Sequence, residues 1–185
     1  MNQNIVVMLR QNDFNIESAR QKYKPSSVKI LLIAEAPPND IERFFYYEDV
    51  REKDFLFLGV VEVIYPELKK DYILKGRRPE SKRFILNKLK SDGIYLIDLS
   101  DTPMSFLVPK TLDHFVKPLL EKVKDLVNMK TKIILIKANI YDALYTELKE
   151  LGHNVINKRI PFPSSGQQEN FRKKFSEAIN SGEDL

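Results

Sequence analysis

The chain has 185 residues, of which 43% are hydrophobic, and its 11 Phe and 8 Tyr supply bulky side chains for one well-filled core. The sequence contains no cysteine, which excludes disulfides, iron–sulfur ligation, thiolate metal sites and a cysteine nucleophile. Its net charge of +4 comes from 30 basic and 26 acidic residues, a mild excess that suits a polyanionic partner without requiring one. We expect a single cytoplasmic domain over residues 1–185, because the sequence shows neither a signal-like start nor an apolar run near about 20 residues.

The first third of the chain combines a helical arm with a buried strand. Residues 1–27 are expected to form an N-terminal helical arm that ends at Lys24-Pro25. Val28–Ala34 (VKILLIA) is almost continuously apolar, which is typical of a strand covered on both faces. Phe55–Tyr65 is ambiguous between helix and strand, and we interpret it as a helix with Asp54 as its cap.

The middle of the chain alternates helical patterns with apolar runs. Pro79 suits the first turn of a helix, and Gly93 follows the end of that helix. A second strand is predicted at Ile94–Leu99 (IYLIDL). After it, Thr111 is expected to cap a long helix that Pro118 kinks or splits.

The last third continues the alternation. A third strand is predicted at Lys132–Lys137, followed by a helix that Asn139 caps and Gly152 closes. The shortest predicted strand is Asn154–Asn157, and a final helix begins near Gln167. This order predicts an α/β fold, a three-layer α/β/α sandwich around a central four-stranded parallel sheet.

In an open parallel sheet, ligands bind beyond the carboxyl ends of the strands. This rule selects the loops at residues 34–40, 98–103 and 161–167, which combine turn formers with hydrogen-bonding side chains. Neither of the two His has a partner at metal-ligand spacing, and we expect no metal or other cofactor.

Basic residues gather in two stretches of the sequence. If these residues flank a cleft, they would bind phosphate groups. Alternatively, they form solvated helix faces. The two stretches comprise Lys69, Lys70, Lys75, Arg77, Arg78, Lys82, Arg83, Lys88 and Lys90, and then Lys158, Arg159, Arg172, Lys173 and Lys174.

Three strand-end segments resemble motifs of the uracil-DNA glycosylase superfamily. Leu31–Pro38 (LLIAEAPP) resembles the Gly-Glu-Ala-Pro-Gly form of its first motif, with Ala and Pro in the two Gly places. Ile94–Pro103 resembles the second-strand segment, and Pro161–Asn170 resembles the His-Pro-Ser-Pro loop and the following helix. The resemblance spans about residues 28–180 in order, without iron–sulfur cysteines. It implies a DNA-binding hydrolase of DNA repair, a glycosidase that cleaves the base–sugar bond of a flipped nucleotide. Separately, we expect a monomer that does not associate with membranes.

The resemblance also suggests which residues contact the base. An aromatic ring from Phe44–Tyr47 would stack on it, and Phe45 or Tyr46 is the candidate. Four aromatic residues in a row cannot all face inward, so at least one is expected to be accessible; alternate members could equally fill the core. Asp98 stands where the superfamily commonly has a base-reading Asn. Ionised, it offers only acceptors, which suits an amino-bearing base; protonated, it offers a donor as well. Alternatively, it caps its own loop.

Glu35 matches the Glu of the first motif and could orient water or stabilise a developing sugar cation. Alternatively, it caps the next helix or bonds its own loop, and Asn39 or Asp40 could take the role at the site.

Phe162 stands in the usual His place and cannot donate a hydrogen bond to a departing base anion. Backbone N–H groups of Ser164, Ser165 and Gly166 could replace that charge in part or bind a phosphate.

Three functions remain open from the sequence. The first is a base glycosylase that uses Glu35 and Asp98 as its catalytic residues. The second is a non-catalytic nucleic-acid-binding member of the same fold. The third is a small-molecule hydrolase or transferase in which Glu35 and Asp98 bind a divalent metal.

Overall fold

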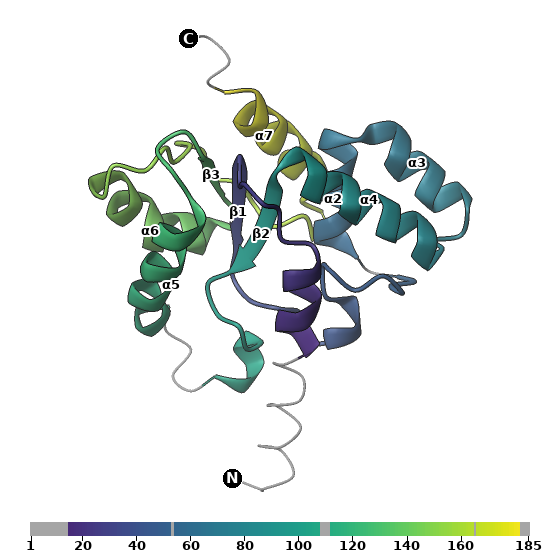
Figure 1. Cartoon of the computed structure of the whole chain (residues 1–185), viewed down its shortest axis with the longest axis horizontal. Coiled ribbons are helices and arrows are strands. Elements are labelled where there is room, and N and C mark those ends of the chain that lie inside the picture. Colours follow the sequence, from purple (N-terminus) through teal and green to yellow (C-terminus); the bar gives the residue numbers. More distant parts are fainter. Residues whose placement is uncertain (1–14, 53, 108–111, 165, 182–185) are drawn as a thin grey trace, which may run out of the picture.

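The computed structural model describes residues 15–52, 54–107, 112–164 and 166–181. At its centre, β1 (Ile30–Ala34), β2 (Ile94–Asp98) and β3 (Lys132–Leu135) form a parallel sheet in the order β2-β1-β3. In Figure 1, α5 and α6 lie on one side of these strands, and α2, α3 and α4 lie on the other. The chain is therefore a mixed α/β protein, as the alternation of apolar runs and helical patterns predicted.

Most predicted helices are present with nearly the predicted limits. Residues 15–22 are helical within the predicted N-terminal arm, whereas residues 1–14 lie outside the described part of the chain. The ambiguous segment after Asp54 is a helix, as predicted. None of the helices in the described ranges is both long enough and apolar enough to cross a bilayer. Besides the strands and the helical residues 15–22, the elements are η1 (Ile41–Arg43), α2 (Phe55–Ile64), α3 (Pro66–Leu74), α4 (Pro79–Asp92), η2 (Met104–Phe106), α5 (Asp113–Leu126), α6 (Ala138–Glu150) and α7 (Gln168–Asn180).

The predicted fourth strand does not form a continuous ladder. The segment beyond α6 meets β3 and its extension only through two isolated parallel bridges, Ile133 with Val155 and Ile136 with Ile160. The Val155 N–H donates to the His153 carbonyl at 2.9 Å, and a second local bond of this kind follows three residues later. This second bond runs from the Lys158 N–H to the Ile156 carbonyl at 2.8 Å and uses an N–H that a ladder with β3 would need, so the sheet has three strands within the described residues instead of four.

Two predicted helix caps have other partners. Asn139 lies inside the first turn of α6, and its amide contacts Glu35. Asp54 stands at the cap position of α2 but makes no capping hydrogen bond, because its carboxylate contacts Lys82. Pro118 lies inside α5, which is one helix, so it does not split the segment. Thr111 lies outside the described residues.

Gly59 brings the segment that carries Phe162 close to α2. A Cβ atom at Gly59 would lie 2.9 Å from the Phe171 ring of α7 and 3.2 Å from Pro163. Glycine is a weak helix former, so its position inside α2 reflects this close packing. The contact holds α7 and the preceding loop against α2, and thereby fixes the wall that Phe162 forms.

Candidate functional site

The carboxyl ends of the strands bring the three predicted loops together. Ala34 pairs with Asp98 in the parallel register, and the Ser100 N–H donates to the Glu35 carbonyl at 3.0 Å. The 161–164 segment closes over the same edge, where Phe162 lines a hollow with Asp98 and a second hollow with Glu35. Residues far apart in sequence therefore meet at one rim of the sheet.

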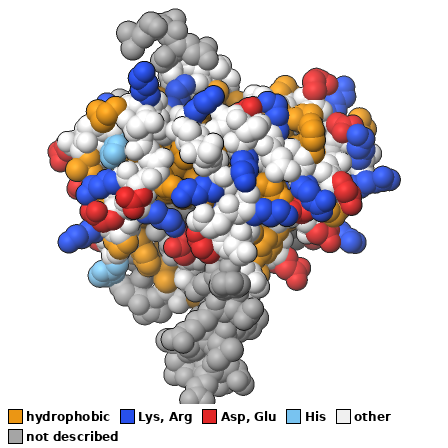
Figure 2. All heavy atoms as spheres, in the orientation of Figure 1, with side chains coloured by type: hydrophobic (Ala, Val, Ile, Leu, Met, Phe, Trp, Pro, Cys, Tyr) orange, Lys and Arg blue, Asp and Glu red, His pale blue; other side chains and the backbone are white. Residues whose placement is uncertain are grey.

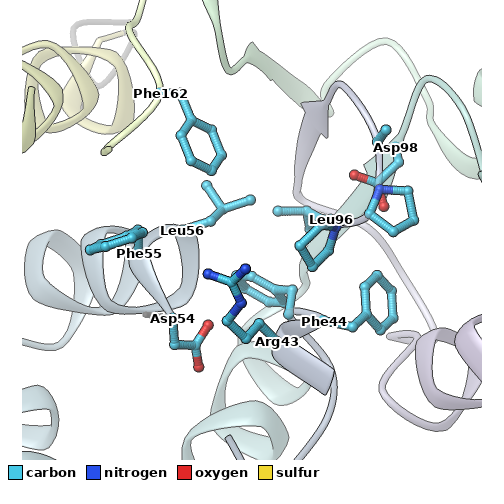
Figure 3. A pocket seen from close by; sticks show the side chains of 12 residues that line it. Arg43, Phe44, Asp54, Phe55, Leu56, Leu96, Asp98 and Phe162 are labelled. Carbon is cyan, nitrogen blue, oxygen red and sulfur yellow. The ribbon is translucent and has the colours of Figure 1, made fainter. Parts of the chain in front are cut away.

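The first hollow, which we call the ring cavity, has a volume of about 140 Å³ and mainly apolar walls. A protein cavity of roughly 150 Å³ accepts a benzene-sized ring, so the ring cavity has room for one six-membered ring. In Figure 3, Phe162 and Phe44 face the cavity from opposite sides, and Asp98 and Asp54 stand at separate ends. Its principal lining residues are Arg43, Phe44, Phe45, Asp54, Asp98 and Phe162.

Asp98 is buried at the end of β2 and pairs with a cation from the N-terminal arm. Arg20 Nη2 donates to Asp98 Oδ2 at 3.1 Å, and Arg20 also contacts Asp101 and Glu17. Burial raises the pKa of Asp98 to about 6, although the Arg20 charge acts in the opposite direction. Asp98 Oδ1 has no donor among the residues that the structure describes, and it can accept a hydrogen bond from a ligand.

A second buried ion pair stands at the other end of the ring cavity. Lys82 Nζ lies 2.5 Å from Asp54 Oδ2 and 4.3 Å from the centre of the Phe57 ring. Burial raises the pKa of Asp54 to about 6 and lowers the pKa of Lys82, against the mutual attraction of the two charges. Arg43 extends its guanidinium group into the cavity near Asp54 (Figure 3).

The aromatic residues of the 44–47 block have different environments. Phe44 and Phe45 line the ring cavity from within the core, and Phe45 packs edge-on against Phe57. Tyr46 is only 3% exposed, and its hydroxyl group exchanges two hydrogen bonds with the Leu96 backbone of β2. Tyr47 is half-buried. Phe45 is therefore placed to contact a ring, whereas Tyr46 is used to hold β2.

The second hollow, which we call the rim groove, adjoins the ring cavity and has a volume of about 560 Å³. Lys137 Nζ donates to Glu35 Oε2, and Asn139 Nδ2 donates to Glu35 Oε1 at 2.5 Å. Glu35 therefore bonds neither the next helix nor its own loop through these oxygens. The principal lining residues of the rim groove are Glu35, Asn39, Met104, Lys137, Phe162 and Ser164.

The predicted phosphate loop is only partly available to a ligand. The Ser164 N–H donates to the Phe162 carbonyl at 2.8 Å, so the loop itself uses this donor. Gly166 is exposed, with φ of +78°. Ser165 lies outside the described residues.

The two basic stretches do not form a uniform positive surface. Figure 2 shows basic and acidic side chains interspersed over the visible face. More than half of the basic residues in these stretches pair with carboxylates, and all of these pairs except the buried Lys82–Asp54 pair favour the interpretation as solvated faces. The pairs are Lys69–Glu62, Lys75–Asp71, Lys82–Asp54, Arg83–Glu48, Lys88–Asp92, Lys158–Glu177, Arg159–Asp142 and Arg172–Glu62.

Several residues of the site were missed from the sequence. Lys137 and Asn139 follow the third strand, so the rule on strand ends that selected Glu35 and Asp98 could have found them. Arg20 could not be identified from the sequence, because it lies in the helical arm, far in sequence from the strand ends that the rule selects. Arg43 lacked a signal as well.

The described ranges contain no group of three or more His, Asp or Glu side chains placed to hold a metal ion. Comparisons of the chain with models of known families, with curated proteins and with solved structures gave no match. The function must therefore be argued from the two hollows and the residues around them.

Proposed function

We propose that the ring cavity binds a nucleobase flipped out of a DNA strand, and that the protein hydrolyses the bond between this base and its sugar. It would thus be a divergent member of the uracil-DNA glycosylase superfamily with the corresponding α/β/α architecture. The observation that carries the proposal is the meeting of Glu35, Asp98 and Phe162 around adjoining hollows, one of them of single-ring size.

The walls of the ring cavity suit a planar heterocycle. Phe45 and Phe162 offer ring faces or edges, and aromatic contacts of this kind favour binding of a flipped base. Asp98 Oδ1 offers an acceptor to the edge of the base. At pH 7 Asp98 is mostly ionised, since its pKa is raised only to about 6, so an amino-bearing base such as cytosine or adenine is the preferred ligand.

Glu35 stands in the rim groove, on the side where the sugar of a bound nucleotide would lie. In the hydrolysis, the C1′–N bond breaks and its electron pair leaves with the base. Water adds to C1′, and the proton that it loses ends on the departing base anion through the solvent, so the products are the neutral base and a C1′ hydroxyl group. A carboxylate has about four acceptor sites, and Lys137 and Asn139 use two at Glu35. The remaining sites can orient the water, and the negative charge can stabilise the developing sugar cation.

Binding without cleavage is the second candidate function, and one specific observation favours it. Phe162 lines both hollows and provides no donor to a departing base anion. The nearby Ser164 N–H is already bonded within its own loop. Loss of one electrostatic donor typically costs about 10²–10³ in rate, so a protein with this site could hold a base and cleave slowly or not at all.

Release of free base distinguishes the two functions. Single- and double-stranded oligonucleotides with uracil, cytosine or adenine are incubated with the protein, and released base is measured by chromatography. We expect Glu35→Gln to reduce release by about a hundredfold or more, and Asp98→Asn to shift the preference toward uracil. Lys88→Met, a change at the opposite edge of the sheet, serves as the control, and melting temperatures verify folding.

A titration with free bases followed by nuclear magnetic resonance completes the test. Shifts at Phe44, Phe45 and Phe162 without any base release would favour the binding protein. If no base is released and no shifts occur at these rings, the proposed function is wrong.

A further inference from the structure

Lys137 has a backbone conformation that normally belongs to glycine. Its φ is 84° and its ψ is 136°, a combination that is unfavourable for a residue with a Cβ atom. The surrounding chain imposes this conformation: the Lys137 N–H donates to the Ile160 carbonyl at 3.0 Å, and its carbonyl accepts from the N–H groups of Ile140 and Tyr141, each at 3.1 Å. A lysine at a position where glycine would be unstrained indicates that its side chain has a role.

The Lys137 side chain lies in the rim groove beside Glu35. Its ammonium group donates to Glu35 Oε2, and the side chain remains 39% exposed. An ammonium group has three N–H donors. The contact with Glu35 therefore leaves two donors that can reach a ligand in the groove.

Lys137 is the only basic side chain among the described residues that line the rim groove. The other donors there are uncharged, namely the Asn39 amide and the hydroxyl groups of Ser105 and Ser164, and the Ser164 N–H is occupied. An anion in the groove would therefore depend on Lys137 for its counter-charge.

The position of the groove indicates which anion it would hold. The ring cavity and the rim groove share Ala36, Pro37, Pro38 and Phe162 as a common wall. A base in the ring cavity would place its sugar at this wall and an attached phosphate in the groove. A lysine ammonium is a compact charge that suits a single phosphate oxygen.

We infer that Lys137 binds a phosphate group of the nucleotide whose base occupies the ring cavity, in place of the Ser164–Gly166 backbone. The inference rests on the proposed function, because it takes the ligand of the ring cavity to be a nucleotide. Lys137 keeps its contact with Glu35 in the complex, so one ammonium group connects the phosphate with the carboxylate that faces the sugar.

The test measures binding of two probes, a short single-stranded oligodeoxycytidylate and the phosphate-free nucleoside deoxycytidine. We expect Lys137→Met to weaken oligonucleotide binding about tenfold. It should also reduce the slope of log affinity against log salt concentration by about 0.7, the value for one phosphate contact on a single strand. Binding of deoxycytidine should be unchanged, and Lys137→Arg should retain most of the oligonucleotide affinity.

Lys88→Met is the matched control, because Lys88 also forms a partly exposed ion pair, with Asp92 near the start of β2. Equal oligonucleotide binding by the wild type, Lys137→Met and Lys88→Met would overturn the inference and leave the proposed function intact. If the wild type binds neither probe, the proposed function is wrong and the inference is overturned with it. Melting temperatures of all variants show whether a loss of binding reflects a loss of folding.

Discussion

The ring cavity and the rim groove share a wall but differ in the burial of their charges. Asp98 and Asp54 in the ring cavity are each 3% exposed, and their partners Arg20 and Lys82 are fully buried. Glu35 and Lys137 in the rim groove form an ion pair whose side chains are 20% and 39% exposed. Buried charges cost much when they lose a partner, whereas exposed pairs contribute little. The ring cavity is therefore built into the stability of the fold, and the rim groove is open to a ligand.

The largest expected effect is the loss of stability when Arg20 is removed from the ion pair at the ring cavity. Arg20→Met leaves Asp98 buried without a cation, and loss of one partner of a buried pair typically costs about 3–5 kcal/mol. The free energy of unfolding is measured by urea denaturation. Arg159→Met is the matched control, because Arg159 forms an exposed ion pair with Asp142, and its loss should cost at most about 1 kcal/mol. Equal losses of unfolding free energy in the two variants would show that burial of an ion pair does not increase the cost of removing its cation.

The pH dependence of stability also tests the burial of Asp98 and Asp54. Aspartates in the unfolded chain ionise near their ordinary pKa of 3.8, whereas Asp98 and Asp54 keep their protons to about pH 6 in the folded protein. The folded state therefore binds more protons over this range, and the free energy of unfolding falls as pH rises. Between about pH 4.5 and pH 6, the two groups together should lower it by about 3 kcal/mol.

A double variant supplies the control for this pH effect. Asp54→Leu combined with Lys82→Met removes one pair without leaving a buried charge, so it should halve the fall in stability and change stability at pH 7 only modestly. Urea unfolding of both proteins across the pH range measures the slopes. If the stability of the double variant falls as steeply between about pH 4.5 and pH 6 as that of the wild type, the raised pKa of Asp54 is contradicted.

The three strands and the site at their ends could be predicted because both depend on local patterns. β1, β2 and β3 are apolar runs covered on both faces, and their pattern needs no knowledge of distant contacts. Gly93 marks the end of α4 through its φ of +80°. Parallel strands place their carboxyl ends at one edge, so Glu35 and Asp98 were expected together there.

The contacts that complete the site could not be predicted, because they join positions far apart in sequence. Arg20 reaches Asp98 across 78 residues, and Lys82 reaches Asp54 from another helix. Asp54 was expected to cap a helix because local propensity favours that role, but the buried lysine competes successfully for its carboxylate. The fourth strand was overpredicted because a short apolar run does not reveal the local hydrogen bonds that interrupt its pairing.

The smallest expected effect concerns Lys137, and its sign is opposite to that at Arg20. In Lys137→Gly, relief of the backbone conformation gains about 1–3 kcal/mol. The greater freedom of glycine in the unfolded chain costs about 0.5–1 kcal/mol, and loss of the Glu35 contact costs up to about 1 kcal/mol. We expect a net gain of stability on the order of 1 kcal/mol, measured by urea denaturation.

Lys137→Met distinguishes the effect of the backbone conformation from the effect of the ammonium charge. It removes the ammonium group but keeps the Cβ atom, so it should gain no stability, and both variants should bind the oligonucleotide more weakly than the wild type. A variant that is more stable and binds less would show that the rim groove maintains an unfavourable conformation for its ligand. The ring cavity differs, because its buried charges are costly only when one partner of a pair is removed. Equal stability of Lys137→Gly and Lys137→Met would mean that the backbone at this position is unstrained, and the case for Lys137 would then depend on its place in the rim groove alone.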